Sequence, residues 1–291
     1  MSVFKHEYHA YEGRVIPRSA RIGVLVRYGL SEAWSSRITV GLFTLAMLPV
    51  IVDLVAIYLA NNSVARMLVS PGSRFPLQID DKFFLRVLSA QCWLALVVNA
   101  WVAPRLVSFD LADNALPILL SHPISRFGYV LGKLIGLFSI LSLVTWVPCL
   151  LLFAYQAYTS PGAWFGPNLQ VAFGLLAGSV LWIVVVALLG LALSSWVKWR
   201  MVATGVIFAA VFVPAGIGGV ITGILRTKWG FLLNVPVMMT EVWQRLLGAP
   251  AVMRRDLELP DAAIAVVLLA AIAISLALLN ARIRAREVVR G

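Results

Sequence analysis

Six long apolar stretches constrain this chain more than any other feature of its 291 residues. About 20 apolar residues cross the hydrocarbon core of a bilayer as a helix, and stretches of this kind lie at 38–60, 83–107, 134–155, 169–196, 201–225 and 262–281. Only 13% of the residues are charged and 61% are hydrophobic, whereas soluble domains carry about 25% charged residues. Because lipid offers no hydrogen-bond partner to an open backbone, each stretch must be helical. The sequence therefore predicts an all-α integral membrane protein with six transmembrane helices.

The segments outside the spans predict the topology. Most of the 24 Lys and Arg residues fall on the side of the membrane that the N-terminus would occupy, in 1–37, in the loop 108–133 and in the basic tail 282–291 among other segments. The positive-inside rule then places both termini in the cytoplasm of a multi-pass protein of the cell (inner or plasma) membrane. Residues 21–37 alternate apolar and polar side chains and predict a helix in the headgroup plane. Residues 38–281 form the transmembrane domain.

The outer segment 226–260 is unusually apolar for a loop. Its composition predicts one or two short re-entrant helices that dip into the outer leaflet before the last span. A seventh, short span is the alternative, and it would move the C-terminus outside. Four arginines in the last ten residues favour the six-span topology.

Charge and motif content exclude several classes of function. The net charge of +11 follows from membrane topology and anionic headgroups, and no basic run is interleaved with the aromatic residues that nucleic-acid binding uses. The three His and two Cys residues have no metal-ligand spacing. The segment from Gly128 to Lys133 is one residue short of a phosphate-binding loop and is followed by Leu134 instead of Ser or Thr. We expect no catalytic, metal-binding or cofactor-binding residue in this chain.

Three polar residues inside the apolar stretches are candidates for a translocation path. Asp53 is the only carboxylate deep in such a stretch, and Gln91 and Asn99 are eight residues apart, on one face of the second span. Each also has a simpler interpretation. The Asp53 carboxylate could extend to the interface, and the two amides could hydrogen-bond between helices.

Glycine pairs at four-residue spacing predict close helix packing. They are Gly132–Gly136, Gly174–Gly178 and Gly219–Gly223. Small residues let helix backbones approach each other in lipid. Packing within the bundle and a dedicated subunit interface are both compatible with these pairs.

The loop between the second and third spans, 108–133, is the most informative segment. Asp110 or Asp113 is placed to cap a short helix, and Ser125 is placed to cap the helix that follows. The short helix carries leucines at i, i+3 and i+4, which share one helix face: Leu116, Leu119 and Leu120. An exposed apolar face of this kind predicts a docking site for another protein.

This loop resembles the signature of type 2 ABC transporter permeases. Members of that family typically show an acidic residue, then Leu-x-x-Leu-Leu-Ser-x-Pro-[Ile/Val]-Ser-Arg, an aromatic or aliphatic residue, and Gly-Lys. The first half departs from the family, because Asp113-Asn-Ala-Leu-Pro replaces the commoner acidic-Gly-Thr-Leu-Glu. The resemblance implies that an ATPase docks on residues of this segment, namely Asp110, Asp113, Asn114, Leu116, Leu119, Leu120, Pro123, Ser125, Arg126, Tyr129 and Lys133.

The resemblance implies an ATP-driven transporter, usually an exporter, of two permease subunits and two separate ABC ATPase subunits. The loop would be the coupling helix that docks on an ATPase, while ATP and Mg would bind the ATPase and not this chain. The second permease would be another copy of this chain or a related one. The remaining partners would be membrane lipids.

Two alternatives to a transporting ABC permease stay open. One is a permease-like subunit that anchors an assembly or transmits ATPase motion to an extracytoplasmic partner without transporting. The other is an ion-coupled secondary transporter that uses Asp53, Gln91 and Asn99. Secondary transporters tend to show inverted repeats, and no repeat relates the two halves of this sequence.

Overall fold

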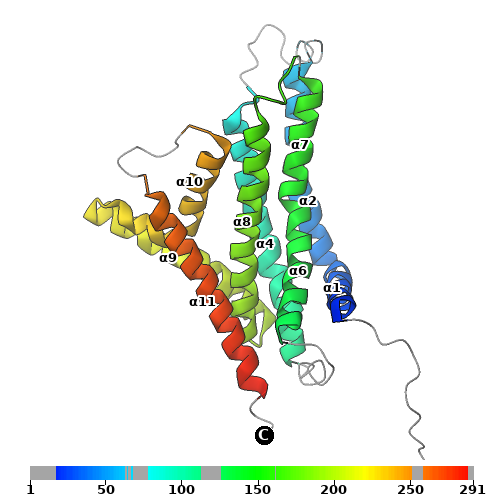
Figure 1. The fold of residues 1–291 in the computed structure, drawn as a ribbon, viewed down its shortest axis with the longest axis vertical. Coiled ribbons are helices and arrows are strands. Elements are labelled where there is room, and N and C mark those ends of the chain that lie inside the picture. Colours follow the sequence, from blue (N-terminus) through cyan, green and yellow to red (C-terminus); the bar gives the residue numbers. More distant parts are fainter. Residues whose placement is uncertain are drawn as a thin grey trace, which may run out of the picture.

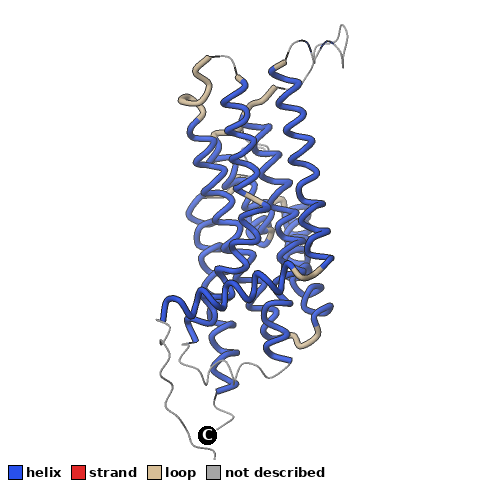
Figure 2. The backbone as a smooth tube through the Cα atoms, turned by 90° about the vertical axis from the view of Figure 1, so that its right-hand side faces the viewer, coloured by secondary structure: helices blue, strands red, loops and turns tan. Residues whose placement is uncertain are grey.

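The computed structural model describes an all-helical chain, with no strand among the described residues. Figure 2 shows helices and short loops only in this part of the molecule. The described residues are 18–62, 64, 67, 78–112, 126–160, 162–250 and 258–287.

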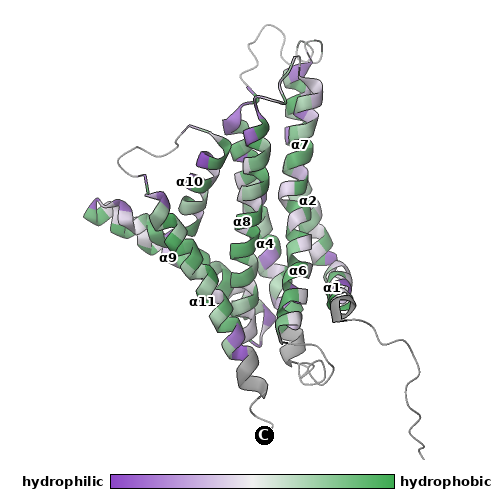
Figure 3. Ribbon diagram, viewed as in Figure 1, coloured by the Kyte–Doolittle hydropathy of each residue, from purple (hydrophilic) through white to green (hydrophobic). Residues whose placement is uncertain are grey.

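Six helical segments are long and apolar enough to cross a membrane, as the sequence predicts. Figure 3 shows hydrophobic residues along most of their length. The segments are α2 (Arg37–Asn61), α4 (Asp81–Ala112), α6 (Arg126–Val144) continued by α7 (Trp146–Thr159), α8 (Leu169–Trp196), α9 (Arg200–Leu225) and α11 (Asp261–Glu287).

The core of the bundle lies around α4 and α8. In each of these helices 67% of the most apolar 18-residue stretch is buried inside the bundle. The corresponding share is 17% in α2 and α9 and 22% in α11. Figure 1 shows α6, α7 and α8 upright and side by side, with α9 and α11 tilted away from them. The outer helices therefore keep wide apolar faces that only lipid or another chain can cover.

The third span is interrupted at Thr145, three residues before Pro148. Helix α6 ends at Val144 and α7 begins at Trp146, while Thr145 has φ −105° and ψ −95°. Pro148 cannot donate a backbone hydrogen bond and its ring clashes with the carbonyl four residues earlier, which is that of Val144. The interruption follows from this clash, whereas α2 and α9 continue through their prolines without one.

The helix expected in the N-terminal segment is α1 (Arg18–Trp34), and it packs across α6 at the lower end of the bundle in Figure 1. A Cβ atom at Gly132 of α6 would lie 3.2 Å from the Cβ atom of Leu25. Leu25 is buried, while Val24 and Tyr28 are exposed. The helix is therefore amphipathic, and its position in the headgroup plane stays a prediction. We call this end of the bundle the α1 end and the opposite end the far end.

The apolar segment before the last span contains two short helices, η1 (Lys228–Leu233) and α10 (Val235–Leu247). The first packs along α9 and the second along α8. At 1.5 Å per residue, α10 is about 20 Å long, which is too short to cross a ~30 Å hydrocarbon layer. This length agrees with six spans, and the entry of α10 into the outer leaflet stays a prediction.

Glycines explain why α10 fits closely against α8. A Cβ atom at Gly174 would lie 2.8 Å from the carbonyl oxygen of Leu246, and one at Gly178 would lie 2.7 Å from Cδ1 of Trp243. The Trp243 indole donates a 3.1 Å hydrogen bond to the carbonyl of Gly178. One predicted glycine pair thus serves packing within the bundle. The pair Gly219–Gly223 faces no atom of the described chain within 4 Å.

Candidate functional site

The one deeply placed carboxylate of the spans, Asp53 on α2, forms an ion pair with Arg86 on α4. Arg86 Nη2 donates to Asp53 Oδ1 at 3.1 Å. The Asp53 side chain is 12% exposed and that of Arg86 is 59% exposed. The Arg86 guanidinium also lies 5.0 Å from the ring centroid of Phe83. The carboxylate is therefore held by the second span instead of extending alone to the interface.

The pair lies at one end of a groove of 520 Å³ between α2 and α4. The rest of its lining is apolar and consists of Leu45, Leu48, Pro49, Val52, Ala90 and Leu94. From Leu45 to Asp53 the groove follows α2 for about 12 Å. The groove thus combines two charges with an apolar lining, which suits an amphiphilic molecule or a helix of another chain.

Distances along α4 indicate the depth of the pair in a membrane. Arg86 and Arg105 are nineteen residues apart on this helix, which is about 28 Å and close to the ~30 Å thickness of the hydrocarbon layer. Arg105 lies towards the α1 end. If Arg105 lies at one headgroup level, this spacing predicts that Arg86, and with it the Asp53–Arg86 pair, lies near the other membrane surface.

The other two candidates for the path, Gln91 and Asn99, are completely buried between helices. Gln91 Nε2 donates to the carbonyl of Ala46 on α2 at 3.3 Å, and Asn99 Nδ2 donates to the carbonyl of Val186 on α8 at 2.9 Å. Neither amide lines the groove beside Asp53. The structure therefore separates the three candidates, with Asp53 at the groove and the two amides in helix–helix contacts.

Most residues of the expected coupling helix lie outside the described part of the chain, namely Asp113, Asn114, Leu116, Leu119, Leu120, Pro123 and Ser125. Helix α4 extends five residues beyond its apolar stretch, to Ala112, so Asp110 belongs to its last turn. Of the two residues expected to cap the short helix, Asp113 is left, and it lies outside the described residues. Helix α6 begins at Arg126, directly after the expected cap.

Two further candidates of this loop, Tyr129 and Lys133, are described and lie on α6. Both are buried, each 3% exposed, and Lys133 Nζ is 5.6 Å from the ring centroid of Tyr129. They occupy the part of α6 that packs against α1. In this structure they are covered, and a docking role for the loop depends on the residues before them.

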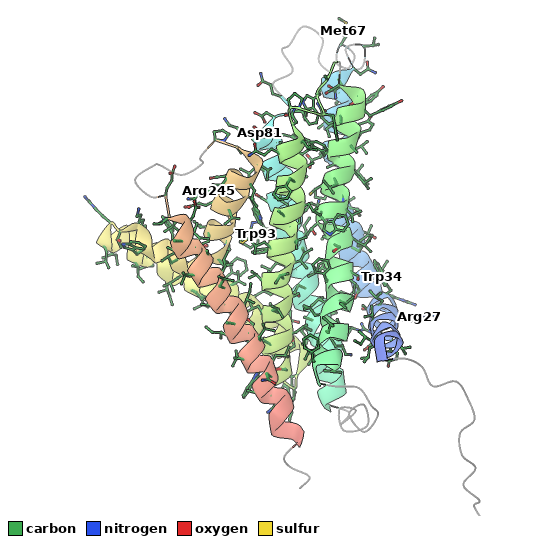
Figure 4. All side chains as sticks on the ribbon, viewed as in Figure 1. Arg27, Trp34, Met67, Asp81, Trp93 and Arg245 are labelled. Atoms are coloured by element: carbon green, nitrogen blue, oxygen red, sulfur yellow. The ribbon has the colours of Figure 1, made fainter. Side chains whose placement is uncertain are left out.

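A second charged cluster fastens α10 to the start of α11, and Figure 4 shows Arg245 on α10 facing this junction. Arg245 pairs with Glu241 at 3.2 Å and also with Asp261, and it donates a 2.6 Å hydrogen bond to the carbonyl of Leu259. The backbone N–H of Leu259 donates to Glu241 at 3.1 Å. The cluster fixes where the last span begins.

Burial raises the pKa of Glu241 above its ordinary value, although the Leu259 N–H and the Arg245 charge act in the opposite direction. One of its carboxylate oxygens, Oε1, is buried without a hydrogen-bond partner among the described residues. An unpaired buried oxygen favours the protonated carboxyl group, which agrees with the direction of the pKa shift.

Sequence reasoning missed both ion-pair clusters. For Arg86, a signal was present, because Asp53 and Arg86 each lie within about three turns of helix ends that meet at the far end. A comparison of the depths of charged residues in neighbouring spans would therefore have predicted the Asp53–Arg86 pair. The Glu241–Arg245 pair has the i, i+4 spacing of a helical ion pair, but its contact with Leu259 depends on the fold.

The described residues contain no group of His, Cys, Asp and Glu that could hold a metal ion. The polar geometry assembled here suits binding and helix fixation, and it provides no nucleophile with an adjacent base. No protein-family model and no curated protein sequence matches this chain. The motif in the loop 108–133 remains the basis for assigning a function.

Proposed function

We propose that this chain is the permease subunit of an ABC transporter, most simply an exporter. It would form the translocation path together with a second permease copy, and it would couple that path to two copies of a separate ATPase. The observation that carries the proposal is the coupling-loop signature from Asp110 to Lys133. The position of the two helix ends that flank the loop supports it.

Helix α4 ends and α6 begins at the α1 end, where the described part of α11 also ends (Figure 1). If the N-terminus is cytoplasmic, the loop that joins α4 to α6 faces the compartment that holds ATP. An ATPase docked on the leucine face of the loop could then transmit its closure to α4 and α6. Both helices pack on α8, so a displacement would reach the core of the bundle.

The exposed outer helices support a second permease copy. Helices α2 and α9 bury only 17% of their most apolar 18-residue stretches, and α9 presents an uncovered glycine pair, Gly219–Gly223. The groove with the Asp53–Arg86 pair opens beside α2. We assign this groove to the border of the translocation path, where a paired acid and base can contact a polar part of the cargo without a net charge.

Two other functions would use the same fold. A proton-coupled transporter usually carries several intramembrane acids or histidines as a relay, whereas Asp53 is paired near one membrane surface. A subunit that transmits ATPase motion to an extracytoplasmic partner would keep the coupling loop but would lack cargo-dependent ATP turnover. The stimulation of ATP hydrolysis by cargo separates this function from transport.

The proposal is tested by purifying the full chain from its native membranes and measuring ATP hydrolysis. We expect a protein with a complete phosphate-binding loop to co-purify in equal amounts and to hydrolyse ATP in the complex. The same chain expressed without that partner should hydrolyse none, because its Gly128–Lys133 segment lacks the phosphate-binding geometry. Hydrolysis by the isolated chain, or ion-driven transport by the chain alone in vesicles, would contradict the proposal.

A further inference from the structure

A group of unpaired hydrogen-bond donors lies towards the α1 end, where α4 and α9 meet. Arg200 is the first residue of α9, and its Cζ lies 3.9 Å from the ring centroid of Trp101 on α4. Thr204 of α9 donates a 2.9 Å hydrogen bond to the carbonyl of Ala100. These contacts fix the Arg200 guanidinium over the Trp101 indole. Arg105 follows Trp101 by one turn on α4.

Four nitrogen atoms of this group are buried and have no acceptor within the described part of the chain. They are Nε and Nη2 of Arg200, Nε of Arg105 and Nε1 of Trp101. Buried donors of this kind are rarely left unpaired, because each loses its bonds to water and gains none in return. Among the described residues, no group supplies these nitrogens with an acceptor that offers several oxygen atoms.

The charges around Arg200 are also unbalanced. The charged groups that act on it are Arg105, which repels it, and Glu32 of α1, which attracts it. Among the described residues, two guanidinium groups and one carboxylate thus act on this site. An anion placed between the arginines would relieve their repulsion and accept hydrogen bonds from both.

Two other arginines of the described spans, Arg86 and Arg282, contrast with this group. Arg86 is paired with Asp53. Arg282 lies over Trp196, with Cζ 5.3 Å from the ring centroid, and so reproduces the arrangement of Arg200 over Trp101. Its Nε, however, donates to the carbonyl of Ser195 at 3.1 Å. Arg282 has its acceptor within the chain, whereas no described residue accepts a hydrogen bond from Nε or Nη2 of Arg200.

We infer that Arg105, Arg200 and Trp101 form a binding site for a phosphate group. Arginine presents a planar set of donors that matches phosphate oxygens, and three such oxygens suit donors that arrive from several directions. The amino end of α9, which has no side-chain cap, adds its partial positive charge. The site lies about 28 Å along α4 from Arg86, which is the headgroup level at the α1 end.

Two sources can supply the phosphate, and the same donors would bind either. One is the headgroup of an anionic lipid in the leaflet at the α1 end, and the other is free phosphate in solution. The site requires neither an ATPase nor a coupling helix. Its presence is therefore independent of the proposed function.

The test compares lipid and phosphate binding by the full chain and three variants. The variants are Arg105→Gln with Arg200→Gln, the conservative Arg200→Lys, and the control Arg282→Gln, which removes an equivalent charge over a tryptophan. Each protein is purified in detergent and titrated with phosphatidic acid, with phosphatidylcholine of the same acyl chains, or with inorganic phosphate. Bound lipid is counted by native mass spectrometry, and the thermal midpoint is recorded in parallel.

We expect the wild type and Arg282→Gln to bind phosphatidic acid at least about tenfold more tightly than the double variant. Arg200→Lys should fall between them, because it keeps the charge and loses the planar donors. If only phosphatidic acid raises the thermal midpoint of the wild type, the source is a lipid headgroup. If inorganic phosphate raises it equally, the source is a free anion. Equal binding of both anions by the wild type and the double variant would overturn the site, as would an equal loss in Arg282→Gln.

Discussion

Replacement of Gly178 by alanine tests how α10 is held against α8. In an exposed helix interior, Gly→Ala normally stabilises the helix by about 1 kcal/mol. At Gly178 the added Cβ atom would lie 2.7 Å from Cδ1 and 3.2 Å from Nε1 of Trp243. Trp243 is 2% exposed and packs edge-on against Trp182 at 5.7 Å. The indole therefore cannot move without disturbing the core.

The expected change in the free energy of unfolding is the sum of two losses and one gain. Overpacking by one methyl group in a closely packed core costs about 1–3 kcal/mol, and a displaced Trp243 indole would also lose its hydrogen bond to the Gly178 carbonyl, worth about 1 kcal/mol. The gain in helix propensity offsets about 1 kcal/mol of this loss. We expect a net destabilisation of about 1–3 kcal/mol.

The assay is the thermal midpoint of the full chain in detergent, read by the loss of the monodisperse peak on size exclusion. The control is Gly205→Ala on α9, where an added Cβ atom would meet no other atom within 4 Å. We expect the control to match or exceed the wild type and Gly178→Ala to melt at a lower temperature. Equal midpoints for the two variants would refute the close packing of α10 on α8.

Two further predictions concern the ion-pair clusters. Arg86→Ala leaves the nearly buried Asp53 carboxylate without its partner and should cost about 1–3 kcal/mol of stability. Asp53→Asn should cost less, because Arg86 is largely exposed. Thermal midpoints in the opposite order would contradict this account of the pair. Because the pKa of Glu241 is raised in the folded protein, the folded state takes up a proton as the pH falls and gains stability relative to Glu241→Gln. Midpoints measured between pH 8 and pH 5 should show the wild type rising relative to that variant, and a constant or opposite difference would argue against a raised pKa.

The number and positions of the spans could be predicted because they depend on local sequence. An apolar stretch of sufficient length must become a helix in lipid whatever its neighbours are. A proline inside an apolar stretch marks a possible break, since its clash involves residues only four apart, but Pro148 lies beside a break whereas Pro49 and Pro214 do not. The helices at 18–34 and 235–247 likewise followed from local apolar patterns.

The contacts that define sites could not be predicted in the same way. Whether Asp53 finds Arg86, or Arg105 lies beside Arg200, depends on the rotation and depth of each helix against another. In lipid many rotations bury similar apolar area, so hydrophobic pattern does not select one. Gly178 illustrates this, because its spacing from Gly174 predicted close packing but not that the contacting residue would be Trp243.

The coupling role of the loop depends on the leucines that share one face of its expected helix. Leu116 and Leu119 lie at i and i+3, and burying each in a groove of an ATPase would contribute about 1.5–3 kcal/mol to docking. Replacing both by aspartate would remove that contribution and place two charges in the groove. The matched control is Ile118→Asp with Ser121→Asp, which adds the same charges to the opposite face of the expected helix.

The most direct test of the permease assignment is therefore the amount of ATPase that co-purifies with these loop variants from native membranes. We expect Leu116→Asp with Leu119→Asp to lose the ATPase while its membrane insertion and thermal midpoint match those of the wild type. The control on the other face should retain the ATPase in equal amounts. If the leucine variant still binds stoichiometric ATPase and supports transport, the loop 108–133 is not the coupling element.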